Sequence, residues 1–462
     1  MLSEESVIVL NHISYENRIL TIVMIVSFVN PFTGSALTLA LPDIGTAYGA
    51  MESQLSWVLE IYLISSTIFI MPLGKLADTW GKKKVFLLGS IIFMFSSLAV
   101  FAVSSMQGLF LLRFFQGIGS ASIFATSLAI IALVYPAEKR GKAMGLTIAA
   151  VYSGLSLGPV IGGLLNYYYQ WQSIFYFIAF FGAVAVLLTL LIMKEEWISN
   201  PEGHMDYWGA VLYAAALVLM MFGLSEILNL FYAPYVLAFG AVLFCLFLYR
   251  EWHQSDPLLP VRIFTQNRIF SCSNFAAMLN YSATFAIGFL LSFYLQRILG
   301  LTSRDAGLIM LVQPVLMALL SPVTGSLSDR IQASVLASSG MGLIAVGLAV
   351  LAYDVPAESI LVIIGCLFII GIGFALFTAP NNNAIMSSVP QEYYGMASSV
   401  VGTVRLIGQV LSVAIVTLIL SRTGSAAADP AEVLMNNIQF AFIVFTVLCL
   451  IGIFPSMVRI RK

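Results

Sequence analysis

Charged residues are scarce in this sequence, because aspartate, glutamate, lysine and arginine together make up only 9% of its 462 residues. Soluble domains carry about 25% of such residues, so a water-soluble fold could not cover the 60% of residues that are hydrophobic. The nucleotide motif G-x-x-x-x-G-K-[ST] and the zinc motif H-E-x-x-H do not occur. We therefore expect neither an ATP-driven activity nor a metal or other cofactor. We expect no nucleic acid as a partner.

Histidine and cysteine are also rare, and their positions argue against an enzyme. The three histidines, at positions 12, 204 and 253, lie in terminal or polar segments. A nominal G-x-S-x-G motif runs from Gly154 to Gly158, but it lies in an apolar run without the strand and histidine that a hydrolase needs. The four cysteines have no paired spacing and indicate neither a disulfide framework nor a metal site. The N-terminus lacks the basic region of a cleavable signal peptide.

Long apolar runs dominate the chain instead. A helix of roughly 20 such residues crosses a hydrocarbon core of about 30 Å. Fourteen spans are predicted, near residues 19–41, 54–74, 84–104, 107–134, 142–165, 172–193, 207–228, 231–249, 269–296, 305–327, 332–353, 358–380, 395–420 and 437–458. The sequence therefore predicts an all-α membrane protein that lies in the lipid bilayer.

The sequence contains an internal repeat. The stretch that begins at Gly74 has a weaker copy at Gly325 to Arg330, displaced by 251 residues, and Asn30 has a counterpart at Asn280, displaced by 250. Such offsets exceed the length of a six-span half by about 60 residues, the size of one helical hairpin. We predict a cytoplasmic N-terminal segment, a six-helix bundle, a linker with two inserted helices and a second six-helix bundle, at residues 1–18, 19–193, 194–268 and 269–462.

Basic residues are distributed unequally between the two sides of this arrangement. Of the 21 lysines and arginines, 16 fall on the side of the Gly74 loop, three on the opposite side and two within spans. Lysine and arginine in short loops favour the cytoplasm. The sequence therefore predicts that both termini lie in the cytoplasm of a protein in the cell membrane.

A short polar stretch, Gly74 to Lys84, joins the second and third spans. Two membrane helices joined by so few residues must turn back, and glycine supplies the backbone freedom for the turn. A carboxylate such as Asp78 suits the positive end of a neighbouring helix, while the lysines favour the anionic cytoplasmic face. We predict a conformational latch in this loop and its copy, consisting of Gly74, Asp78, Gly81, Lys82, Asp329 and Arg330.

Arg113 lies inside the fourth predicted span, where a cation costs several kcal/mol unless it faces a partner or water. Glu60 is the only acid well inside the second span, and both residues lie about six residues, or roughly 9 Å, from the outer end. Our hypothesis is that the two face one cavity and influence each other's protonation, so that Glu60 accepts a coupled proton or pairs with a cationic substrate. A structural role for Arg113 and an interfacial place for Glu60 are the alternatives.

Other residues within the spans are candidates for packing or substrate contact. Gly154, Gly158 and Gly162 recur every four residues and form a smooth stripe, beside Pro159, which weakens the helix, and Gly163. Such a stripe permits close helix contact, with plain packing as the alternative. Substrate cavity candidates are Asn30, Gln116, Asn280, Tyr281, Gln313 and Arg405, for which local helix hydrogen bonding is the alternative.

Several of these motifs resemble those of one family. The spacing G-x-L-A-D-x-x-G-K-K from Gly74 resembles the signature loop of the major facilitator superfamily, and R-x-x-Q-G-x-G-x-A from Arg113 resembles its fourth-span motif. Residues 154–163 are similar to its antiporter motif, and residues 380–409 to the matching region of its fourteen-span drug:proton antiporter family. The resemblance implies two six-helix bundles around a central cleft. One departure is that Thr33 stands in place of the family's first-span aspartate.

The resemblance implies a function. We expect a monomeric transporter that exports small amphiphilic organic compounds, including drugs, in exchange for protons through alternating access. Either Glu60 replaces the missing aspartate, or the coupling is different or absent. A dedicated metabolite exporter or an uncoupled facilitator is the main alternative, and a receptor or scaffold that transports nothing is a further one.

Overall fold

The computed structural model describes residues 14–38, 40–49, 52–227, 230–254, 257–259, 261–301, 303–354, 359–420 and 430–458. Within these ranges the chain forms helices and no strands, and 14 segments are long and apolar enough to cross a membrane. The predicted all-α membrane fold with fourteen spans is therefore confirmed. Residues 1–13, most of the predicted N-terminal segment, lie outside the described residues.

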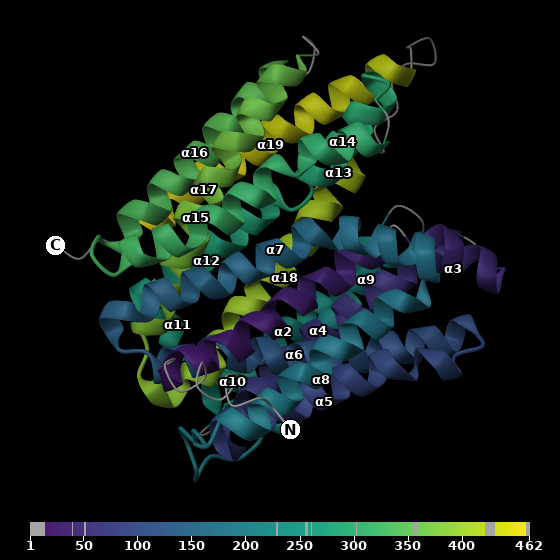
Figure 1. Cartoon of the computed structure of the whole chain (residues 1–462). Coiled ribbons are helices and arrows are strands. Elements are labelled where there is room, and N and C mark those ends of the chain that lie inside the picture. The colour runs from purple at the N-terminus through teal and green to yellow at the C-terminus, as the bar shows by residue number, and fades with distance from the viewer. Residues whose placement is uncertain are drawn as a thin grey trace.

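The first six spans and one short helix form the N-terminal bundle (Figure 1). Its helices are α2 (Tyr15–Thr38), α3 (Leu41–Tyr48), α4 (Glu52–Trp80), α5 (Lys82–Leu98), α6 (Met106–Val134), α7 (Ala137–Tyr169) and α8 (Gln172–Ile192). α2 packs along α7 and α8, while α6 packs against α4 and α5. Because lipid tails are as apolar as these side chains, close packing and internal hydrogen bonds hold such helices together.

The last six spans form the C-terminal bundle. Its helices are α12 (Arg268–Thr284), α13 (Ile287–Phe293), α14 (Ser303–Met310), α15 (Val312–Ser328), α16 (Ala333–Asp354), α17 (Ile360–Ser387), α18 (Tyr394–Leu420) and α19 (Pro430–Val458). α12 packs on α18 and α19, and α16 packs on α17 and α19. α12 and α13 together make one span, as do α14 and α15.

Two further spans lie between the bundles in the sequence. They are α9 (Tyr207–Ser225) and α10 (Ala233–His253), and the short helix α11 (Arg262–Gln266) follows them. The two spans pack mainly on each other, and α9 also contacts α4 and α18. Tyr213 makes that contact specific, because its buried hydroxyl donates to the Thr67 carbonyl of α4 at 3.0 Å and lies 3.1 Å from Thr403 Oγ1 of α18. The insert therefore connects both bundles along one seam.

The turn between the second and third spans is shorter than predicted. α4 continues to Trp80, so Gly74 and Asp78 are helical, and only Gly81 separates α4 from α5. Gly81 has a φ of 124°, a conformation that side chains disfavour. Asp78, one of the polar residues that suggested a loop, is buried within the helix. It can remain there because backbone N–H groups of Gly395 and Met396, in the other bundle, donate to its carboxylate. We call this end of the molecule the Gly81 end.

The bundles meet along two seams, one formed by α7 and the other by α18, and they diverge toward the opposite end. α7 packs on α15 and α17, while α18 packs on α4 and α6. Figure 1 shows the bundles close together where α7 begins and spread apart toward α3 and α14. This arrangement places the contact between bundles at the Gly81 end and in the middle of the molecule.

Candidate functional site

Asp78 fastens the end of α4 to the start of α18 in the other bundle. Its two carboxylate oxygens accept hydrogen bonds from the backbone N–H groups of Gly395, at 3.0 Å, and Met396, at 2.9 Å. The ammonium of Lys82, which is fully buried, lies 2.8 Å from the same carboxylate. A carboxylate at the first turn of a helix is stabilised by the exposed N–H groups and the helix dipole.

Asp329 makes the equivalent contact on the other seam. It follows α15 and accepts hydrogen bonds from the backbone N–H groups of Gly141, at 2.8 Å, and Lys142, at 3.1 Å, near the start of α7. Burial raises the pKa of the Asp329 carboxyl above its ordinary value, although the two N–H donors act in the opposite direction. Arg330 is exposed at the surface. The latch role predicted for these residues stays a prediction.

Glycines allow the two bundles to approach closely at the Gly81 end. A Cβ atom on Gly74 would overlap the Ser399 side chain and lie 2.9 Å from the Gly395 carbonyl oxygen. On the other seam, a Cβ atom on Gly145 would overlap the Ser321 carbonyl oxygen. Sequence reasoning identified Gly74 but missed Gly145, whose only signal is its spacing of four from Gly141. Both seams therefore depend on positions without a side chain.

The antiporter-like glycines pack within the N-terminal bundle. Gly154, Gly158 and Gly162 all face α2, because Cβ atoms there would overlap Phe28, Ser35 and Ala36 respectively. Pro159 and Gly163 lie on the same helix with partial exposure. The structure thus joins the stripe to the first span rather than to the C-terminal bundle, and its link to transport direction stays a prediction.

A buried polar network connects the first, second and fourth spans. The Asn30 Oδ1 atom accepts hydrogen bonds from the Tyr62 hydroxyl and, at 2.7 Å, from the Ser120 hydroxyl. Asn280, its counterpart in the repeat, is equally buried, but neither polar atom of its side chain has a hydrogen-bond partner. The two asparagines therefore hold corresponding positions in the repeat, but Asn30 accepts hydrogen bonds from two neighbours whereas the Asn280 side chain has no hydrogen-bond partner.

Arg113 is fully buried in the same bundle. Its Nε donates to the Val58 carbonyl oxygen at 2.8 Å, its Nη1 donates to Gln116 Oε1 at 2.8 Å, and its guanidinium lies 4.3 Å from the centre of the Tyr62 ring. Gln116 in turn donates to Ser97 at 2.7 Å. Glu60 is half-buried on α4 and is not among these contacts of Arg113. The proposed coupling of Glu60 with Arg113 stays a prediction.

Arg405 lies where helices of both bundles meet. Its guanidinium is 4.3 Å from the centre of the Phe124 ring of α6, and it interacts electrostatically with the hydroxyls of three tyrosines, Tyr62 of α4, Tyr152 of α7 and Tyr281 of α12. We call these five residues the Arg405 cluster. The Tyr152 hydroxyl lies 3.3 Å from Thr378 Oγ1 of α17, so the cluster crosses between bundles.

The remaining candidates lie apart from this cluster. Gln313 is half-buried on α15, and its Nε2 atom lies 3.9 Å from Met317 Sδ of the same helix.

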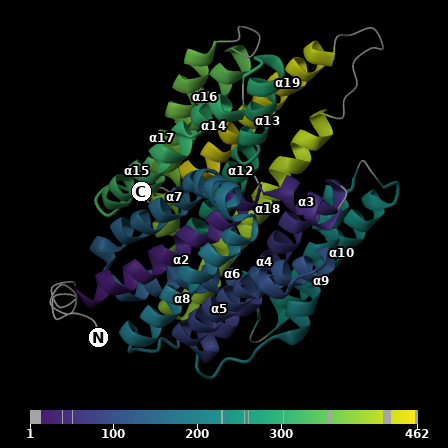
Figure 2. The same cartoon turned by 45° about the vertical axis from the view of Figure 1, so that its right-hand side comes forward.

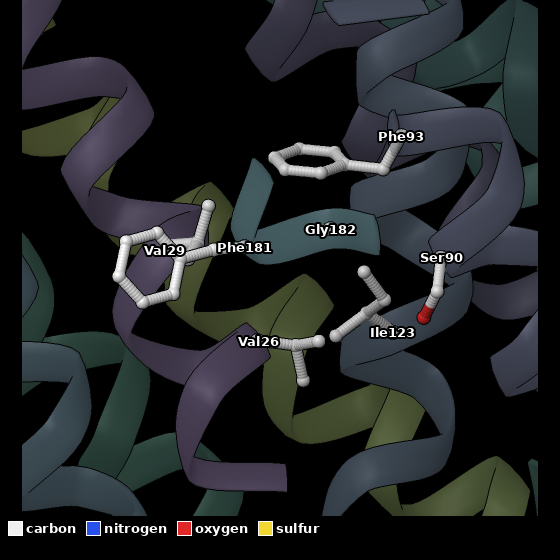
Figure 3. Close-up of a pocket in the computed structure, with 7 residues that line it drawn as sticks. All are labelled: Val26, Val29, Ser90, Phe93, Ile123, Phe181 and Gly182. Atoms are coloured by element: carbon white, nitrogen blue, oxygen red, sulfur yellow. The ribbon is translucent and has the colours of Figure 1, made fainter. Parts of the chain in front are cut away.

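A small apolar cavity, shown in Figure 3, lies within the N-terminal bundle between α2, α5, α6 and α8, and Val29, Phe93 and Ile123 contribute to its lining. This cavity has no charged lining residue and does not reach the seam between the bundles. In the described ranges, no group of histidine, cysteine, aspartate and glutamate could hold a metal ion.

Comparison with known proteins assigns the family. The model of the Major Facilitator Superfamily matches residues 23–259 and 274–461. The chain belongs to this superfamily. Its relatives include the riboflavin transporter RibZ of Clostridioides difficile, 32% identical over 84% of both chains. They also include the multidrug resistance protein Stp of Mycobacterium tuberculosis, 30% identical over 85% of this chain and 74% of the relative. The chain is therefore a membrane transporter and not an enzyme.

Solved structures of two other transporters share the fold. The human organic anion transporter MFSD10 superposes with a TM-score of 0.66 at 16% identity, covering 96% of this chain and 99% of that protein. The proton:xylose symporter XylE gives a TM-score of 0.63 at 14% identity, with 95% and 94% covered. The superfamily motifs found in the sequence thus correspond to a superfamily fold.

Sequence reasoning missed three residues of the Arg405 cluster, Tyr62, Tyr152 and Phe124, since aromatic residues are too common in membrane spans to stand out.

Proposed function

We propose that this superfamily member is a secondary active transporter, which exports small amphiphilic organic compounds from the cytoplasm by alternating access. The observation that carries the proposal is the Arg405 cluster, because it joins side chains from five helices of both bundles in the middle of the molecule. A substrate bound there would contact both bundles, so their relative movement could expose it to either side. The relatives named for multidrug resistance support this class of substrate.

The direction and the sidedness belong to the same proposal. The sequence assigns 16 of the 21 basic residues to the side of the Gly81 end, so by the positive-inside rule this end would face the cytoplasm, with both termini. The bundles touch at that end, so the conformation would be the one open to the outside. We propose that the protein works as a monomer, because each monomer contains both bundles and both seams.

We further propose that protons drive the export and that Glu60 carries them. Thr33 cannot replace the aspartate of the family, since its buried hydroxyl donates to the Val29 carbonyl oxygen at 2.8 Å and bears no charge. Glu60 is the acid well inside the second span, and it is half-buried on α4. One proton that crosses 100 mV supplies about 2.3 kcal/mol, enough to concentrate a substrate appreciably.

The experiment is transport by the purified protein in vesicles with an imposed pH gradient. We expect gradient-dependent movement of amphiphilic compounds, loss of that dependence in Glu60→Gln, and no loss in Glu138→Gln, a control in which an exposed acid of α7 is neutralised. Proton coupling that is unchanged in Glu60→Gln would remove the role of Glu60. Transport of no compound under any gradient would remove the proposed function itself.

A second candidate function is a dedicated metabolite transporter. The relative named as a riboflavin transporter favours it, because that protein is 32% identical over most of both chains. A dedicated transporter would move one compound and ignore close analogues, and an uncoupled facilitator would exchange substrate after the pH gradient has collapsed. Counterflow measured without a gradient, across a panel of metabolites and drugs, separates these alternatives from proton-driven export.

A further inference from the structure

We propose that the Arg405 cluster selects planar aromatic molecules whose edge carries a negative charge, such as aromatic carboxylates, and disfavours aromatic cations. This inference rests on the proposed function, since it names the substrate class for the site between the bundles. It differs from the expectation of a broad preference for amphiphilic compounds, because it assigns a sign to the charge that the site accepts.

The first argument is the uncompensated charge of Arg405. Within the described part of the chain no carboxylate pairs with its guanidinium, and its Nε atom is buried without a hydrogen-bond partner. The face of Phe124 contributes only about 0.5–2 kcal/mol to a cation, whereas a cation deep in a membrane costs several kcal/mol. A carboxylate ligand could accept two parallel N–H bonds from the guanidinium and compensate the charge.

The second argument is the aromatic wall around this charge. Tyr152 and Tyr281 come from opposite bundles, and each of their rings lies 6.4 Å from the ring of Phe374, centre to centre. Tyr281 and Arg405 are partly exposed although both lie near the middle of a membrane span. Figure 2 shows α18, which carries Arg405, running beside α12 and α6. Flat rings would stack on these side chains, and their polar edges could bond to the hydroxyls.

The third argument concerns the acids near the cluster. The first-span position that holds an aspartate in the family is Thr33, which is uncharged and satisfied by its own helix. The guanidinium of Arg113 also lies 4.3 Å from the centre of the Tyr62 ring. In the described residues no ion pair joins a carboxylate to Arg405 or Arg113, so a cationic ligand would meet two fixed positive charges. At an effective dielectric constant of about 20, like charges 4 Å apart repel by about 4 kcal/mol, so an aromatic cation would bind weakly.

The test is equilibrium binding to the purified full-length protein by isothermal titration calorimetry, with three naphthalene derivatives that differ in charge. The probes are 2-naphthoate, neutral 2-naphthamide and the cation 2-naphthylmethylammonium. We expect naphthoate to bind at least tenfold more tightly than the cation, with the amide between them. Arg405→Gln should abolish this preference, Arg405→Lys should keep its sign, and Arg268→Gln, which removes an exposed arginine, should leave it unchanged.

The wild-type comparison already decides the matter if Arg405→Gln fails to fold. Equal or tighter binding of the cation, or binding of none of the three probes, would overturn the inference, and so would an unchanged preference in a folded Arg405→Gln protein. The measurement uses no membrane gradient. Charge-selective binding without transport would thus contradict only the proposed export, whereas transport without charge selectivity would contradict only the substrate class.

Discussion

Asp78 and Asp329 occupy equivalent places in the two bundles and make the same contact. Each lies at the end of a helix of one bundle and accepts two backbone N–H bonds near the start of a helix of the other, Asp78 from α18 and Asp329 from α7. Their numbers differ by 251, the offset between the polar stretches that begin at Gly74 and Gly325. The internal repeat thus produces two equivalent sets of hydrogen bonds between the bundles at the Gly81 end.

Removing either carboxylate should loosen the Gly81 end. Asp78→Ala and Asp329→Ala leave two N–H groups without acceptors, at a cost on the order of 1–3 kcal/mol. We expect faster hydrogen–deuterium exchange at the start of α18 in the first variant and of α7 in the second. Asp43→Ala is the control, because Asp43 bonds to Asn166 within one bundle. Exchange that is as slow as in the wild type at both helix starts would refute the role of these contacts.

A side chain at Gly74 should prevent the bundles from closing at this end. Gly74→Ala places a Cβ atom against Ser399 and the Gly395 carbonyl oxygen of α18, and small-to-large changes at packed sites cost about 1–3 kcal/mol. We expect transport in vesicles to fall at least tenfold. Gly342→Ala is the matched control, since no atom lies within 4 Å of a Cβ there. Equal transport by both variants would count against the close approach.

The two asparagines of the repeat should respond in opposite ways to leucine. Asn30→Leu removes the acceptor of Tyr62 and Ser120 and should lower the melting temperature, because breaking a buried hydrogen bond costs about 1–3 kcal/mol. Asn280→Leu removes two buried polar atoms that have no partner and should raise the melting temperature or leave it unchanged. Thermal unfolding in detergent measures both. A lower melting temperature for Asn280→Leu than for Asn30→Leu would contradict the hydrogen bonding described for the two asparagines.

Tyr213 should stabilise the seam between α4 and α18 through its hydroxyl alone. Tyr213→Phe keeps the ring but leaves the Thr67 carbonyl oxygen and Thr403 without this partner, at about 1 kcal/mol. We expect a lower melting temperature than in Tyr235→Phe, which changes an exposed tyrosine of the same insert. If the two variants melt alike, the insert does not hold the bundles through this group.

Composition and repetition suffice to predict the fold of this chain. The apolar runs locate all fourteen spans, since a membrane requires a helix of fixed length wherever the chain crosses it. The boundaries near Asp78 are less well predicted, because a buried charged residue with partners in another bundle looks like a loop residue in the sequence. The turn at Gly81 is therefore shorter than the polar stretch suggests.

The candidate site is harder to predict than the fold. Counting residues from the end of a span gives the depth of Glu60 and Arg113 but not the direction in which either side chain points. Arg113 turns toward Val58 and Tyr62. The partners of Arg405 come from helices far apart in the sequence, and no local pattern connects Phe124 with Tyr281. Only the packing of the bundles brings them together.

The central claim, that the two bundles move relative to each other and so expose the Arg405 cluster to either side in turn, is tested most directly by spin-label distances between them. In a variant without native cysteines, one label pair at Lys139→Cys and Gln332→Cys reports the Gly81 end, and another at Tyr168→Cys and Tyr353→Cys reports the opposite end. We predict that Asp78→Ala with Asp329→Ala lengthens the first distance and shortens the second. Unchanged distances, or a change of both in the same direction, would contradict the account.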